Sequence, residues 1–344
     1  MIDLRSDTVT LPSKEMKEFM FDAPLGDDVF GEDPSINALQ DKASNLFQKE
    51  KALFVPSGTM ANLISLLTHC NRGDEILLGN KSHIFKYEAG GASAFGGIHS
   101  HQLNNNDDGT IDINNIIENI RDTRDDHFPK TKLLCLENTH NFCYGSAITQ
   151  EYIAEVKSQI SQFNIKLHID GARIFNAATS LNCSVSTLAQ DADSITFCLS
   201  KGLSCPSGSL ILGTSDFIKK AKKIRKGLGG GMRQAGILAS AGIYALDNLT
   251  NRLGEDHENA LLIAKGLEDV DNIDIDISKV STNLIFFYLK KNDLSDESFI
   301  NKLLENKIKI DSKGNRKFRI ATHYGFASDN IERVINTIKS IVNN

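Results

Sequence analysis

Short apolar runs recur along the first two thirds of the sequence, and segments with helical spacing separate them. This alternation is typical of α/β folds, in which helices join the strands and cover both faces of one mostly parallel sheet. Runs that are apolar throughout favour strands buried on both faces. The six predicted strands span residues 52–56, 75–78, 132–136, 166–169, 194–199 and 209–212.

The pattern changes after about residue 250. Strands are predicted at 283–289 and 317–321, and helices at 297–306 and 329–342, which together compose a smaller α+β domain. A chain of 344 residues also exceeds the size that one core usually reaches. We therefore expect three parts: an N-terminal segment that packs at the functional site (1–25), a large domain (26–249) and a small C-terminal domain (250–344).

Composition narrows the class of partner. A formal net charge of −6 opposes attraction to phosphate backbones, so we expect a small-molecule substrate and no nucleic acid. No apolar run reaches the roughly 18 residues of a membrane span, and residues 1–10 lack the features of a secretory signal. The six cysteines show no paired short spacing, which favours reduced thiols in the cytoplasm. Motifs for nucleotide hydrolysis, dinucleotide binding and zinc proteolysis are absent, and we assign no metal ligands.

Polar residues follow three of the predicted strands, at the edge where open α/β sheets bind ligands. Ser57, Gly58 and Thr59 precede a helical segment, and exposed amides at a helix start suit a phosphate. Serine before a helix is more often only an N-cap. Asp170 ends a buried run and needs a cation, which a protonated pyridine nitrogen would supply; a structural pair with Arg173 is the alternative.

Lys201 follows the run 194–199. A lysine at the end of a buried strand is partly desolvated and can act as an amine that forms an imine, although most such lysines simply reach water. The combination is more specific than any part of it. A phosphate cup, a pyridine partner and an imine-forming amine follow three strands in that order.

The motifs around these residues resemble those of the low-specificity L-threonine aldolases, which are PLP (pyridoxal phosphate) enzymes of fold type I, the aspartate-aminotransferase-like class. The resemblance covers effectively the whole chain. It implies a large α/β domain with a mostly parallel seven-stranded sheet and a small α+β C-terminal domain. It also implies a homo-oligomer that is at least a dimer, with a dimer of dimers expected. The matching segments are residues 4–10, 31–34, 56–62, 88–91, 137–141, 170–176, 197–203, 229–234 and 319–323.

The resemblance assigns roles around the cofactor. It implies that Lys201 binds PLP covalently and that Asp170 keeps the pyridine nitrogen protonated. Gly58 and Thr59 would bind the phosphate, and His83 would stack on the ring. Each of these residues also has a purely structural interpretation when it is considered alone.

Two histidines are expected near the substrate. His140 matches a second family histidine close to the substrate hydroxyl, and cleavage needs a base for that proton. The sequence leaves open whether His83, His140 or a bound water is that base.

Arginines are expected to bind the substrate carboxylate, because their planar fork pairs with it bidentately. By resemblance the candidates are Arg319 and Arg173, with Ser6 adding a hydroxyl; contact of Arg173 with the phenolic oxygen of PLP is an alternative. Lys226 and Arg233 would reach a cofactor phosphate across a subunit interface.

The resemblance predicts a lyase that cleaves L-threonine, L-allo-threonine and other β-hydroxy-α-amino acids to glycine and an aldehyde. β-Elimination or racemisation on the same scaffold, and a catalytically silent PLP-binding protein, are the alternatives. The chain departs from the family pattern at 204–205 and at 142–144, and both segments are expected to border the substrate pocket. These departures leave the preferred substrate open.

Overall fold

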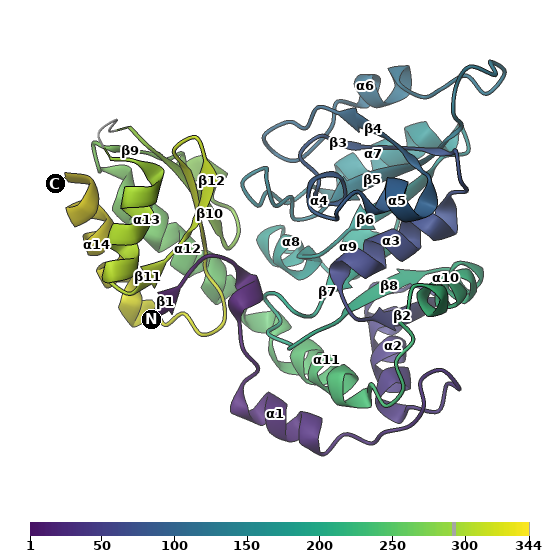
Figure 1. Cartoon of the computed structure of the whole chain (residues 1–344), viewed down its shortest axis with the longest axis horizontal. Helices are drawn as coiled ribbons and strands as arrows, with labels where there is room; N and C mark the ends of the chain where they lie inside the picture. The colour runs from purple at the N-terminus through teal and green to yellow at the C-terminus, as the bar shows by residue number, and fades with distance from the viewer. Residues whose placement is uncertain (291–293, 344) are drawn as a thin grey trace.

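The computed structural model describes residues 1–290 and 294–343, and it shows two lobes of unequal size (Figure 1). The larger lobe contains a seven-stranded sheet of order β2-β8-β7-β6-β5-β3-β4, in which only β8 runs against its neighbours. This architecture confirms the predicted fold class. Its strands are β2 (Lys51–Val55), β3 (Glu75–Gly79), β4 (His99–Leu103), β5 (Thr131–Glu137), β6 (Lys166–Asp170), β7 (Ser194–Cys198) and β8 (Ser209–Gly213).

Helices cover both faces of this sheet. Alternate residues of a strand point to opposite faces, so Phe54 joins one core cluster while Leu53 and Val55 join another. α2 (Pro34–Phe47), α7 (Gln150–Ser161) and α11 (Gly236–Asn248) bury apolar residues on the first face, and α3 (Gly58–His69) and α10 (Ser215–Gly227) do so on the second. Shorter helices of this lobe are α4 (His83–Lys86), α5 (Gly91–Gly96), α6 (Ile113–Glu118), α8 (Ile174–Ser180) and α9 (Val185–Ala189).

The sequence did not predict β4. This strand pairs only with β3, at the edge of the sheet, and its residues His99 to Gln102 are exposed or partly exposed. An edge strand with polar residues lacks the apolar run on which the prediction depended.

The smaller lobe has its own sheet and core. Four antiparallel strands have the order β12-β13-β10-β9, and their apolar residues pack with those of three helices. The domain limits at residues 25 and 249 stay a prediction. The elements are α12 (Leu253–Glu268), β9 (Ile273–Asp274), β10 (Leu284–Leu289), α13 (Asp296–Glu305), β12 (Asp311–Gly314), β13 (Lys317–Ala321) and α14 (Ile331–Asn343), with 3₁₀ turns at Thr250–Arg252, Ile277–Lys279 and Ser328–Asn330.

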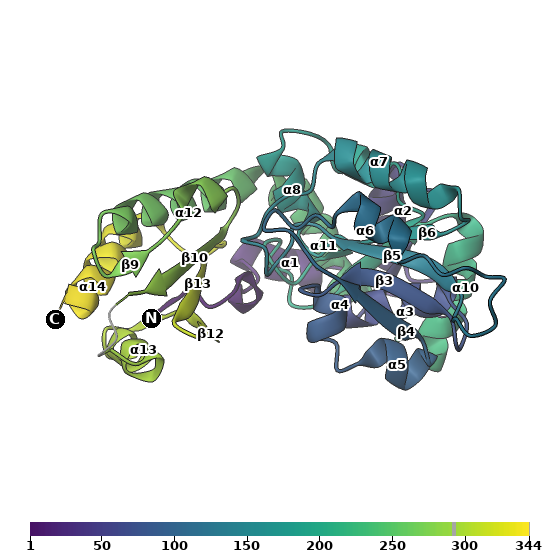
Figure 2. The same ribbon diagram turned by 90° about the horizontal axis from the view of Figure 1, so that it is seen from above.

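The N-terminal segment contacts both lobes. β1 (Ile2–Asp3) pairs with β11 (Ile308–Lys309) of the smaller lobe, and α1 (Lys14–Phe21) packs against α11. Between them the 3₁₀ turn Asp7–Val9 passes where the lobes meet, as Figures 1 and 2 show. Within residues 1–290 and 294–343, every helix is too short or too polar to cross a membrane.

Candidate active site

A pocket of about 180 Å³ lies where the two lobes and the N-terminal segment meet. Most of its walls come from loops that follow the carboxyl ends of β3, β5, β6 and β7, as the switch-point rule for α/β sheets predicts. It is lined by Ser6, Thr8, His83, Tyr87, Asn141, Phe142, Arg173, Lys201, Lys313 and Arg319.

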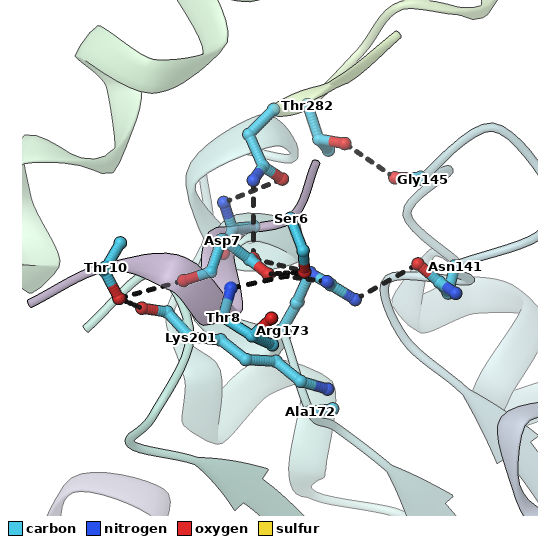
Figure 3. A network of polar contacts seen from close by, with 12 residues as sticks. Ser6, Asp7, Thr8, Thr10, Asn141, Gly145, Ala172, Arg173, Lys201 and Thr282 are labelled. Carbon is cyan, nitrogen blue, oxygen red and sulfur yellow. Dashed lines mark hydrogen bonds and ion pairs between the residues drawn. The ribbon is translucent and has the colours of Figure 1, made fainter. Parts of the chain in front are cut away.

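Lys201 lies in the turn after β7 and lines this pocket. Its backbone carbonyl accepts a hydrogen bond of 3.0 Å from the Thr10 hydroxyl, which also bonds to the Asp7 carbonyl (Figure 3). The N-terminal segment is thereby attached to the loop that carries the lysine.

Asp170 ends β6 and is almost fully buried. Its Oδ2 accepts a hydrogen bond of 2.9 Å from Asn62, and its Oδ1 accepts one of 3.1 Å from the Ala172 amide. Burial alone would raise the pKa of Asp170, but nearby His83 and Lys201 and the Asn62 hydrogen bond keep this pKa below its ordinary value. The carboxylate is therefore anionic and suited to a cationic partner.

Arg173 has a partner that the sequence did not suggest. Its Nε and Nη2 donate to the two carboxylate oxygens of Asp7 at 2.6 and 2.7 Å, and both side chains are buried (Figure 3). This bidentate pair takes the place of the structural pairing with Asp170 that the sequence left as an alternative, and it occupies the fork that a substrate carboxylate would need. Its remaining nitrogen, Nη1, makes only a 3.4 Å hydrogen bond to Asn141.

Arg319 reaches the pocket from β13 of the smaller lobe. Its Nη1 donates to Asn141 at 2.7 Å, and its Nη2 lies 3.0 Å from a carboxylate oxygen of Asp311, which Lys313 also contacts. One carboxylate thus faces two cations. The Arg319 Nε is buried with no partner in the described part of the chain.

The two candidate histidines have different environments. His83 begins α4 and lines the pocket, with its backbone amide donating to Glu137 at 2.7 Å. His140 is buried and does not line the pocket; its ring lies next to Gly109, and neither ring nitrogen has a partner among the described residues. The structure brings only His83 to the other pocket residues.

The predicted phosphate cup begins α3. The Ser57 hydroxyl accepts from the Met60 amide at 3.2 Å, so this serine is an N-cap. The amides of Gly58 and Thr59 have no acceptor among the described residues. A Cβ on Gly58 would lie 2.7 Å from the Cys198 sulfur, so the close approach to β7 requires glycine.

The two basic residues predicted to reach across a subunit interface lie outside this pocket. Lys226 is exposed at the end of α10, and Arg233 pairs with Asp27 at 2.9 Å. The loop between them packs beside the start of α3, because a Cβ on Gly230 would lie 2.3 Å from the Met60 sulfur.

An aromatic wall was only partly expected. Tyr87 stacks between His83 and Phe142, with ring centroids 5.7 and 5.2 Å apart, and the Lys313 ammonium lies 5.2 Å from the Phe142 centroid. The unusual segment 142–144 therefore borders the pocket through Phe142. Ser204 and Cys205 are buried and do not line it.

Comparison with known proteins identifies the relatives of this chain. A model of the beta-eliminating lyase family matches residues 3–292. The chain is 49% identical to a low specificity L-threonine aldolase of Escherichia coli over 83% of this chain and 84% of that protein. It is 44% identical to low-specificity L-threonine aldolase 1 of Arabidopsis thaliana over 96% and 93%.

A solved structure of the Leishmania major threonine aldolase has the same fold. Its TM-score is 0.83 at 19% identity, with 99% of this chain and 100% of that one covered. At this identity the likeness concerns the architecture alone.

Proposed function

Since the chain belongs to the beta-eliminating lyase family and, within it, to the low-specificity L-threonine aldolases, we propose that it uses PLP to cleave L-threonine and L-allo-threonine to glycine and acetaldehyde. Other β-hydroxy-α-amino acids would release their own aldehydes. The observation that carries this proposal is one pocket lined by Lys201, His83 and Arg319, with anionic Asp170 buried beside it.

The residues present fit PLP. Lys201 would supply the amine that holds it, and the Asp170 carboxylate would pair with a protonated pyridine nitrogen. The amides of Gly58 and Thr59 are donors without acceptors in the described part of the chain, which suits the phosphate. Lys226 and Arg233 stay candidates for phosphate contacts from a neighbouring subunit.

The substrate carboxylate would be bound by Arg319, with a further hydrogen bond from Ser6. Arg319 and Lys313 share one carboxylate, so their wall carries excess positive charge that an anion can neutralise. Arg173 is a weaker candidate for this role than the sequence indicated, because Asp7 occupies its fork. It would instead hold the N-terminal turn at the pocket.

His83 is the proposed base. It lines the pocket, so it can take the proton of the β-hydroxyl group, whereas buried His140 does not line it. When bound, PLP would supply the electron sink that accepts the electron pair left at Cα as the bond to Cβ breaks. A proton delivered to Cα then completes glycine.

The proposal includes a cytoplasmic homo-oligomer. All six cysteines lie in the described part of the chain and are free, which suits a reducing compartment.

The test is to look for the absorbance of bound PLP in the purified protein and to assay L-threonine and L-allo-threonine separately with aldehyde reduction. Turnover to glycine and acetaldehyde by the wild type, together with none by Lys201→Ala, would establish the reaction. Release of a keto acid and ammonia would replace it with β-elimination. A protein that cannot take up PLP would overturn the cofactor assignment.

A further inference from the structure

The ring of His83 contacts a buried carboxylate that has no role in the proposed reaction. Its Nδ1 lies 2.9 Å from the Oε1 of Glu88, whose side chain is only 4% exposed. Glu88 follows Tyr87, the C-cap residue of α4, and the next two residues, Ala89 and Gly90, have left-handed φ values of 53° and 65°. An alanine adopts that conformation only where surrounding contacts hold it, so the chain is strained at the point where Glu88 turns inward.

Asn62 of α3 holds Glu88 in place. Its amide nitrogen donates to Glu88 Oε1 at 2.7 Å and to Asp170 Oδ2 at 2.9 Å, so one side chain joins both carboxylates. One ligand atom each of His83, Glu88 and Asp170 lie within 4.8 Å of one another. Because amide hydrogens point at both carboxylates, this cluster is a hydrogen-bonded network and not a cation site.

A second layer fixes the orientation of that amide. The Oδ1 of Asn62 lies 3.2 Å from the Thr196 hydroxyl and 3.3 Å from His168 Nε2, and Ser194 lies 2.8 Å from the other nitrogen of His168. Burial lowers the pKa of His168 to about 4, so its ring is neutral and can keep one tautomer. The amide oxygen therefore faces donors, and the amide nitrogen faces the two carboxylates.

We propose that Glu88 is a positioning residue that fixes His83 as the tautomer protonated on Nδ1, with Asn62 holding Glu88 in register with Asp170. The Nε2 lone pair of His83 is then free to accept the substrate's hydroxyl proton, and the negative charge of Glu88 stabilises the imidazolium that forms. A carboxylate behind a histidine acts in the same way in catalytic triads. This inference rests on the proposed function for the identity of that proton.

Charged groups around His83 set the direction of the pH effect. Burial, and to a smaller extent the charge of Lys201, lower the pKa of His83. The Glu88 hydrogen bond and the negative charges of Asp170 and Glu88 outweigh these effects, so the pKa is raised. Glu137 contacts the His83 backbone, and Tyr87 stacks on its ring. The base works only when neutral, so kcat/KM should rise with pH through this raised pKa.

Glu88→Gln tests the inference directly. Oε1 of Glu88 receives both hydrogen bonds, so glutamine can keep both while losing the charge. We expect the pKa of His83 to fall by about one unit, and the acid limb of kcat/KM to move down by the same amount. Deuterium exchange at the imidazole Cε1, followed by mass spectrometry of the His83 peptide, measures this pKa in the full-length protein without reference to activity.

Glu88→Ala removes the acceptor as well as the charge, so its kcat should be about ten times lower than that of Glu88→Gln. Glu75→Gln is the matched control, since Glu75 is also buried beside histidines, His99 and His101, away from the pocket. It should leave the pKa of His83 unchanged.

An unchanged His83 pKa and acid limb in a folded Glu88→Gln protein would overturn the inference. If the wild type did not cleave threonine at all, the proposed function would fail instead. The exchange measurement would still show whether Glu88 controls His83.

Discussion

The polar groups in and around the pocket form two halves that are built differently. The inner half comprises Asp170, Asn62, Glu88 and His83, which all come from the larger lobe. The Asn62 amide joins the two carboxylates, and Glu88 contacts His83. The outer half comprises Asp7 and Arg173 together with Arg319, Asp311 and Lys313, and it combines the N-terminal segment with both lobes.

This difference separates two tasks. The inner groups lie on β6, α3, α4 and the turn after α4, all in the larger lobe, so they keep their places if the smaller lobe moves. The outer half exists only when the lobes and the N-terminal turn are together. Substitutions in the inner half should therefore change kcat, and those in the outer half should change stability or KM.

The largest expected effect on rate is in the inner half. Asp170→Asn should lower kcat about 10²–10³-fold, because a neutral side chain no longer stabilises a protonated pyridine nitrogen. The free energy of unfolding should fall by only about 1 kcal/mol, since asparagine can still accept the Asn62 hydrogen bond at its carbonyl oxygen and loses only the one from the Ala172 amide. Steady-state kinetics and urea unfolding check both parts. A loss of stability as large in free energy as the loss of rate would show that the two halves do not differ in this way.

In the outer half, Asp7→Asn should lower the free energy of unfolding by about 3–5 kcal/mol, because it leaves the Arg173 charge buried without a counter-ion. Asp3→Asn is the control, since Asp3 pairs with the half-exposed Arg5 at the surface and should contribute less than about 1 kcal/mol. Equal losses in the two variants would show that burial of the pair does not matter.

The same pair predicts a pH dependence. Burial opposes ionisation of Asp7, but the charge and hydrogen bonds of Arg173 hold the pKa of Asp7 well below its usual range. The stabilisation is therefore complete above the unfolded pKa of about 4 and is lost as the pH falls towards the folded value. The stability difference between wild type and Asp7→Asn should be constant from pH 7 to 5 and should shrink below pH 4. A difference that stays constant on acidification would contradict this assignment.

The smallest effect concerns substrate binding. Arg319→Lys should raise KM for threonine about tenfold with little change in kcat, because lysine cannot pair bidentately with a carboxylate. Arg252→Lys is the control, since Arg252 pairs with Asp256 and does not line the pocket. A lower kcat with an unchanged KM would move Arg319 into the group that affects the chemistry.

Features that are local in sequence could be predicted. Each of the six predicted strands overlaps a strand of the seven-stranded sheet, because a run of apolar residues by itself indicates a buried strand. Polar residues directly after a strand, such as Asp170 and Lys201, could be found by the same logic. Glu88 was visible only as part of a family motif, without a role.

Pairings between distant segments could not be predicted. Asp7 and Arg173 are 166 positions apart, and Asn62 contacts a carboxylate 108 positions away. No spacing rule encodes such pairs, because only the assembled sheet and lobes bring them together. His140 shows the converse limit, since a motif match indicates proximity to a site without showing which way a ring points.

The pairing of β1 with β11 has a consequence for synthesis of the chain on the ribosome. Residues Ile2 and Asp3 emerge long before their partners Ile308 and Lys309, so the strand stays unpaired while the residues between them are translated. Domains generally fold as units during translation, and the larger lobe can form its sheet in that interval. The pocket can be completed only after β13, which carries Arg319, has emerged, so binding of the proposed cofactor by the full site would come late in the synthesis of the chain.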